Sequence, residues 1–122
     1  MPKRKTKMAV EQPELRFKVR IGTDALGPGK IRLLQQIEQS GSISGAARAC
    51  GMNYRRAQYL LETLNQAVGA PVVETVVGGP KGGGAQLTDS GKRLIEAFQA
   101  LEQAVKKATV DPLAELAQIV TS

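Results

Sequence analysis

The sequence predicts a mainly α fold with a small antiparallel sheet, arranged as a winged helix-turn-helix followed by a long C-terminal helix. Three stretches indicate this fold. Residues 41–61 have the pattern of two short helices joined by a tight turn. Residues 72–87 have the pattern of two strands separated by glycines, and residues 88–107 form one long amphipathic stretch. Their order along the chain is the order of elements in that fold.

The composition favours a single domain with a polyanionic partner. The chain has 122 residues and a formal net charge of +6, which points to nucleic acid first and an anionic membrane second. It has no histidine and one cysteine, Cys50, so a thiolate zinc site and an internal disulfide are excluded. We expect no metal, no cofactor and no enzymatic activity. No apolar signal-peptide core follows the charged start, and we expect a cytoplasmic protein.

The N-terminal third is predicted to contain a basic arm, a strand and a helix. Residues 1–14 are polar and contain prolines, so we expect a flexible arm that is either a solubilising tail or a source of phosphate contacts. Leu15–Ile21 alternates apolar and cationic residues, which predicts a half-buried strand with a cationic outer face. A helix is expected over Lys30–Ser40, ended by Gly41. We expect the folded domain over residues 15–108 and a short tail or helix over 109–122.

The next two helices are predicted from their caps and apolar faces. Ser42 suits the N-cap of the first, Gly51 the turn, and Asn53 the N-cap of the second, which extends to Val68. The side of the second helix opposite its apolar face is cationic and aromatic near its start. The apolar stripes comprise Ile43, Ala46, Ala47 and Cys50 in the first helix, and Ala57, Leu60, Leu61, Leu64 and Val68 in the second.

The C-terminal half is predicted to contain a wing and a long helix. Val72–Val77 is strand-like and Ala85–Leu87 can pair back with it, while Gly78–Gly84 is expected to form a loop too long for a two-residue hairpin turn. Thr88 suits the cap of the final helix, which we expect to stop at Asp111-Pro112 before a short helix over Leu113–Val120. An apolar seam on the long helix is either intermolecular or packed on the first helix, and we expect a homodimer. Its residues are Leu94, Phe98, Leu101 and Val105.

Four motifs resemble those of the N-terminal DNA-binding domain of ModE-type molybdate-responsive regulators, and more distantly the winged domain of LysR-type regulators. They are residues 41–47 (GSISGAA), 54–57 (YRRA), 78–84 (GGPKGGG) and 87–91 (LTDSG). The resemblance extends over about residues 15–107 and implies a DNA-binding transcriptional regulator. ModE-type regulators that sense molybdate carry additional C-terminal oxyanion-binding domains. Because the sequence ends at Ser122, we expect a stand-alone ModE-like protein without molybdate binding.

Residues and resemblance together predict a homodimeric regulator that binds a palindromic operator in double-stranded DNA. Arginine forks fit guanine O6 and N7 or a phosphate, so Arg55 and Arg56 are the leading contacts, and Lys81 is expected on a backbone phosphate. The alternative is a winged-helix protein-interaction module that does not bind DNA. The candidate DNA-binding residues are Ser42, Ser44, Asn53, Tyr54, Arg55, Arg56, Gln58, Tyr59, Lys81, Gly82 and Gly83.

Overall fold

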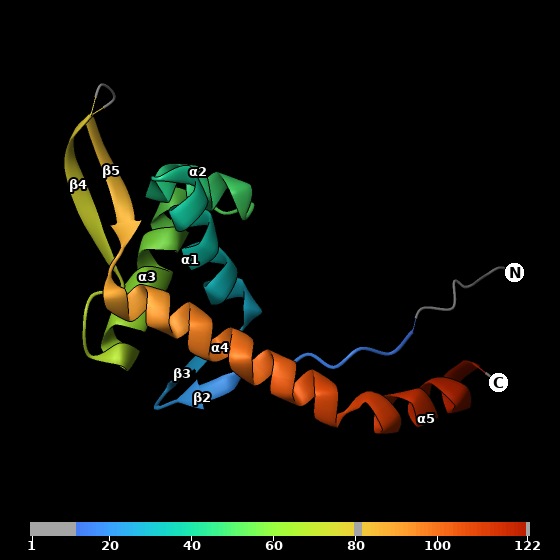
Figure 1. The fold of residues 1–122 in the computed structure, drawn as a ribbon. Helices are drawn as coiled ribbons and strands as arrows, with labels where there is room; N and C mark the ends of the chain where they lie inside the picture. Colours follow the sequence, from blue (N-terminus) through green and yellow to red (C-terminus); the bar gives the residue numbers. More distant parts are fainter. Residues whose placement is uncertain (1–11, 80–81, 122) are drawn as a thin grey trace, which may run out of the picture. The chain divides into compact units, whose positions relative to one another are not determined.

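The computed structural model describes residues 12–79 and 82–121 (Figure 1). The predicted mainly α class is confirmed, with two small antiparallel sheets in this part of the chain instead of one. The elements are β2 (Val19–Ile21), β3 (Asp24–Leu26), α1 (Pro28–Ser40), α2 (Ile43–Ala49), α3 (Tyr54–Val68), β4 (Val73–Gly79), β5 (Gly82–Leu87), α4 (Asp89–Ala108) and α5 (Val110–Thr121).

The chain divides into two compact units. The first comprises Phe17–Gln99 and contains every element from β2 to the first part of α4. The second contains residues 100–121, which include the rest of α4 and all of α5, together with the described residues 12–16. All described residues that the sequence suggests for DNA binding therefore belong to the first unit.

The first sheet corrects the prediction for the N-terminal strand. Only Val19–Ile21 is extended in a ladder, and Leu15 is 48% exposed, so the predicted strand over Leu15–Ile21 was too long. Its partner, β3, was not predicted; Ile21 pairs with Asp24 across a two-residue turn. Gly22 has a φ of 63° there, which glycine adopts without the steric cost of a side chain.

The caps of α1, α2 and α3 are confirmed. Gly41 ends α1 in the left-handed conformation with a φ of 76°, and Gly51 has a φ of 70° in the turn between α2 and α3. The Ser42 hydroxyl accepts a hydrogen bond from the Gly45 N–H at 2.9 Å, and the Asn53 side chain accepts one from the Arg56 N–H at 2.7 Å. These local bonds fix where each helix begins.

The core of the first unit lies between the three short helices, the hairpins and the start of α4. Leu33, Leu34, Ile37 and Val72 are fully buried, and the Phe17 and Phe98 rings stack with centroids 5.7 Å apart. Val68, predicted on the buried face of α3, is 36% exposed because it lies in the last turn, where fewer neighbours cover it. Thr63 is buried instead, with its hydroxyl donating to the Leu60 carbonyl at 2.7 Å.

The second hairpin corrects the predicted glycine loop. Strand pairing continues to Gly79 and Gly82, with an irregular register between Val76 and Gly79. A seven-residue loop over Gly78–Gly84 was therefore wrong, because glycine can take an extended conformation and the flanking strands align it for pairing. Figure 1 shows the hairpin projecting beyond the helices at the end of the unit where α2 lies.

Backbone contacts join this hairpin to the helices. The Ala85 N–H donates to the Gly41 carbonyl at 2.8 Å, and the Asn65 side chain accepts from the Val72 N–H at 2.9 Å. The Thr88 hydroxyl donates to the Pro71 carbonyl at 2.7 Å and accepts from the Gly91 N–H at 3.1 Å, which confirms Thr88 as a cap. The hairpin is thus fixed at its base and along one edge.

The C-terminal helices differ from the prediction in their bounds. α4 ends at Ala108, before Asp111-Pro112, and α5 begins at Val110. Pro112 therefore lies in the first turn of α5, where its missing N–H costs no helical hydrogen bond, and does not act as a helix stop. Of the helices in the described residues, none combines the length and apolar character needed to cross a membrane.

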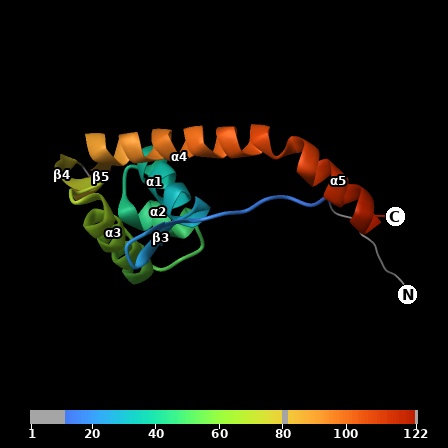
Figure 2. The same ribbon diagram turned by 90° about the horizontal axis from the view of Figure 1, so that it is seen from below.

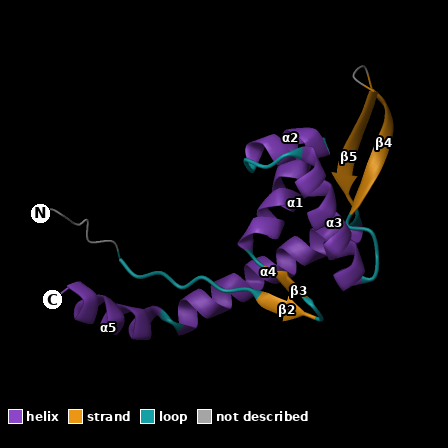
Figure 3. Cartoon of the chain, turned by 180° about the vertical axis from the view of Figure 1, so that it is seen from behind, coloured by secondary structure: helices purple, strands orange, loops and turns teal. Residues whose placement is uncertain are grey.

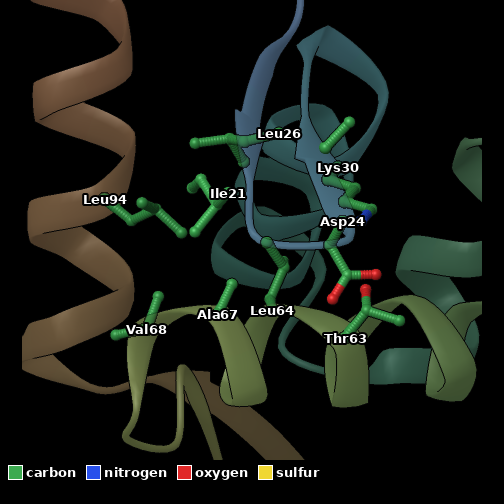
Figure 4. Close-up of a pocket in the computed structure, with 10 residues that line it drawn as sticks. Ile21, Asp24, Leu26, Lys30, Thr63, Leu64, Ala67, Val68 and Leu94 are labelled. Carbon is green, nitrogen blue, oxygen red and sulfur yellow. The ribbon is translucent and has the colours of Figure 1, made fainter.

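The first unit leaves little internal space. One cavity of about 10 Å³ lies between β2, β3, α3 and the start of α4, on the order of a single water molecule. Figure 4 shows Ile21, Leu94 and Val68 around this space. α1 lies next to the first part of α4 (Figure 2), and glutamine side chains of both helices line an open groove. The small cavity has no room for an organic ligand.

Candidate nucleic-acid interface

The start of α3 presents a group of exposed polar side chains. Tyr54 is 48% exposed and Tyr59 is 56% exposed, and Arg55 and Arg56 are exposed as well. The Asn53 cap holds the first turn in helical geometry, so these side chains project from a defined helix end. This end of α3 offers cationic and aromatic groups together.

Packing fixes the rotation of α3 about its axis. Ala57, Leu60, Leu61 and Leu64 are buried on one side of the helix. At about 100° per residue, the opposite direction passes through Arg55, Tyr59 and Glu62. The predicted inner and outer faces of α3 are thus confirmed over its first three turns.

Two pairs of side chains are preorganised on this surface. The Gln58 Nε2 donates to the Tyr54 Oη at 2.7 Å, one helical turn away. The Arg56 guanidinium carbon lies 5.9 Å from the centre of the Tyr59 ring, within reach of a cation–π attraction. Each contact restricts side chains that would otherwise sample several rotamers.

The stretch from the end of α1 through α2 to the middle of α3 contains positive charges only. Residues 39–61 contain three arginines and no aspartate or glutamate. One of the three, Arg48, is not among the DNA-binding residues predicted from the sequence. It is exposed in the last turn of α2. The sequence could have indicated Arg48 as a candidate, because it is the one charged residue of α2. Exposed arginines attract phosphate, and salt screens the attraction.

The α2 residues divide by role. The Ser42 side chain is half-buried and its hydroxyl is engaged as the helix cap, whereas Ser44 is exposed in the first turn. In the turn after α2, the Met52 N–H donates to the Ala47 carbonyl at 2.9 Å, which fixes how the chain leaves α2 toward α3. The structure therefore brings the α2 candidates and the start of α3 into one part of the unit.

The hairpin candidates are described only in part. Gly82 and Gly83 lie in β5, where Gly82 pairs with Gly79 and Gly83 is exposed. Lys81 lies outside the described residues. In Figures 1 and 3 the far end of the hairpin and α2 are at the same end of the first unit.

The four residues of the predicted dimerisation seam have different surroundings. Phe98 is 3% exposed and belongs to the core of the first unit, and Leu94 is half-buried against that core. In the second unit, Leu101 is 39% exposed and Val105 is half-buried. Phe98 therefore packs within its own chain, which is one of the two alternatives that the sequence left open for this seam.

Two features of the described residues bear on metal and thiol chemistry. Within residues 12–79 and 82–121, no group of three or more His, Cys, Asp or Glu side chains is placed to hold a metal ion. Cys50 is a free, half-buried cysteine that packs against the core beside the turn.

The fold and this surface define a small, basic, mainly α-helical protein with a cationic-aromatic helix end. Its relatives specify the family. The chain is 42% identical over 101 residues to the molybdenum transport protein ModE of Azotobacter vinelandii, a match that covers 83% of the chain and 37% of the relative. It is 43% identical over 89 residues to the molybdenum-pterin-binding protein MopA of Rhodobacter capsulatus, covering 73% of the chain and 34% of the relative.

A third relative carries the name of a regulator. The chain is 42% identical over 81 residues to the DNA-binding transcriptional dual regulator ModE of Escherichia coli, covering 66% of the chain and 31% of the relative. The chain spans about a third of the length of these relatives. No family model matches it. The matches confirm the ModE-type resemblance: over the shared stretch this is a ModE-type sequence.

Proposed function

We propose that the chain is a DNA-binding transcriptional regulator of the ModE type, in which α2, the turn and α3 act as a helix-turn-helix and β4–β5 act as a wing. The name of the Escherichia coli relative supports regulation by DNA binding. The names of these relatives describe transport, binding or regulation, which supports a role without enzymatic activity. A regulator of this kind acts on DNA in the cytoplasm.

One observation carries the proposal. The exposed start of α3 bears two adjacent arginines, and residues 39–61 contain no carboxylate that would repel phosphate. A protein partner would have to desolvate these guanidinium groups and provide carboxylates for them. A DNA duplex provides phosphates along its whole length and acceptor atoms in its major groove.

The proposed complex assigns roles to seven of the eleven candidates. The start of α3 enters the major groove, where Arg55 and Arg56 contact guanine O6 and N7 or a phosphate. Ser44, Asn53 and the N–H groups at the start of α2 contact phosphates of the DNA backbone. Lys81, Gly82 and Gly83 bring the tip of the wing close to a neighbouring phosphate, because glycines let the protein backbone approach it.

The proposed regulator is a homodimer. Leu101 and Val105 leave apolar surface on the C-terminal half of α4, and Leu94 is only half-buried. Two copies related by a two-fold axis would place two α3 helices on successive turns of the duplex. The operator is then palindromic.

Molybdate binding is proposed to lie outside this chain. Relatives named for molybdenum transport or molybdenum-pterin binding are about three times as long as the matched stretch. We expect that titration of the purified chain with molybdate gives no binding heat and no change in DNA affinity. A saturable heat signal would show instead that this chain itself binds molybdate.

The decisive experiment replaces Arg55 and Arg56 with alanine. We expect R55A/R56A to lose specific binding in an anisotropy assay on DNA selected from a random library, while circular dichroism keeps the native spectrum, since both side chains are exposed. The matched control is K92A/R93A, which removes two consecutive exposed cationic residues from α4. Loss of binding in the control alone, or in neither variant, would contradict the proposal.

Salt dependence separates DNA binding from the protein-interaction alternative. Wild-type affinity for DNA should fall by orders of magnitude between low and moderate salt, because bound phosphates release counterions. R55A/R56A should show a shallower slope of affinity against salt than K92A/R93A. A chain that selects no DNA at any salt concentration would be an interaction module.

A further inference from the structure

We infer that Gln58 reads an adenine in the major groove and that Tyr54 positions its amide; this inference rests on the proposed function. Gln58 lies about 60° from Arg55 around the axis of α3, at the edge of the outward side of the helix. It is half-buried, so its stem is supported by the helix surface. The Gln58 side chain therefore starts next to that of Arg55 on the helix surface, and its amide is bonded to Tyr54.

The bond to Tyr54 restrains the Gln58 side chain before DNA is bound. The Nε2 donates to the Tyr54 Oη at 2.7 Å across one helical turn. A free glutamine would lose rotamer entropy on binding a base, and this bond removes part of that loss in advance. Tyr54 accepts this bond, so its own O–H proton remains available for a phosphate oxygen.

The restrained amide keeps the groups that adenine requires. An amide nitrogen carries two N–H donors, so after one bond to Tyr54 the second N–H and the carbonyl oxygen are both available. Adenine presents an N7 acceptor and an N6 donor in the major groove, which match this pair. Guanine presents acceptors at both N7 and O6, which would leave the Gln58 carbonyl facing another acceptor.

The next residues along this side of α3 limit the reading surface. Glu62 is exposed one turn beyond Gln58, and its carboxylate repels phosphate. Gln66, also exposed, lies eight positions beyond Gln58, about 12 Å further along the axis. Gln66 is therefore outside the proposed contact and serves as a control with the same chemistry.

The test selects DNA sites from a random duplex library with wild type, Q58E and Q66E. A glutamate at position 58 accepts a hydrogen bond from cytosine N4, so Q58E should change one base pair in each half-site from A·T to C·G. We expect Q66E, which adds the same charge on the same helix, to select the wild-type site. Wild type should prefer A·T at the switched position by roughly 10- to 100-fold in affinity.

Two further variants make the result decisive. Q58A should lose the A·T preference at that single position and keep the base preferences at all other positions. This variant tests the inference even if the added charge of Q58E prevents DNA binding. Y54F should weaken the same preference, whereas a tyrosine that only contacts phosphate would lower affinity equally for all bases. An unchanged A·T preference in Q58A would overturn the inference while leaving the proposed function intact. Failure of wild type to select any site would overturn both.

Discussion

At the scale of single residues, Gly91 lies closer to a neighbouring backbone than a side chain permits. A Cβ at this position would overlap the Val72 carbonyl oxygen, a backbone atom that cannot rotate away. Gly91 is buried in the first turn of α4, and its N–H donates to the Thr88 hydroxyl. This contact brings the start of α4 against the residue that precedes β4.

We expect G91A to lower the free energy of unfolding by at least about 2 kcal/mol, because the added methyl must displace the Val72 backbone. The control G29A makes the same change in the first turn of α1, where a Cβ meets nothing within 4 Å. Alanine there should be neutral or stabilising by about 0.5 kcal/mol. Urea denaturation measures both, and equal stability of the two variants would contradict the close contact.

Residue roles were predictable where they depend on local bonds. Ser42 and Asn53 were identified as caps because an N-cap interacts with residues only three positions away. Thr63 was missed because its burial depends on neighbours distant in the sequence, and its hydroxyl is satisfied by the Leu60 carbonyl. The Tyr54–Gln58 bond has the common spacing of one helical turn, but only rotamers decide whether it forms.

At the scale of elements, α3 depends on its cap for a defined start. We expect N53A to lower the free energy of unfolding by about 1 kcal/mol, since the Arg56 N–H loses its acceptor. Asp is also a good cap, so N53D should keep wild-type stability but weaken DNA binding by placing a negative charge beside the phosphates. Thermal denaturation and DNA anisotropy separate the two effects. Full DNA affinity in N53D would remove Asn53 from the interface.

The helices were more predictable than the strands. The helices have apolar stripes long enough to define a period, as the buried face of α3 illustrates. Alternation over Leu15–Ile21 predicted β2 but overstated its length, whereas β3 has three residues, too few for alternation to be recognised. A signal for their turn existed in Gly22-Thr23, a two-residue connection that begins with glycine. In the second hairpin, glycines fit both a loop and an extended ladder, and pairing with β4 decided between them.

At the scale of the whole molecule, self-association is expected to depend on the C-terminal part of α4. We expect L101E/V105E to convert a dimer to a monomer in sedimentation velocity, because Leu101 is 39% exposed and Val105 half-buried. The control Q99E/Q103E adds two negative charges with the same spacing on the opposite side of the helix. Dimers in both variants would exclude this seam.

Phe98 gives a contrasting result within the same predicted seam. Its ring is 3% exposed and stacked on Phe17, so F98A should cost about 3 kcal/mol or more of unfolding free energy. The seam pattern could not separate these roles, because residues that pack within a chain and between chains repeat with the same period. Unaltered stability of F98A in urea denaturation would show that this aromatic contact contributes nothing to the fold.

The bond between Ala85 and Gly41 also has a consequence for the DNA. Because β5 is attached to the end of α1, the hairpin cannot swing independently of the helices that precede it. If both touch one duplex, the protein imposes a fixed separation between two grooves, and a duplex with other groove dimensions must bend or twist to match it. The cost of that deformation differs between stiff A-tracts and flexible pyrimidine–purine steps. Operator choice would then depend on DNA mechanics at base pairs that no side chain reaches.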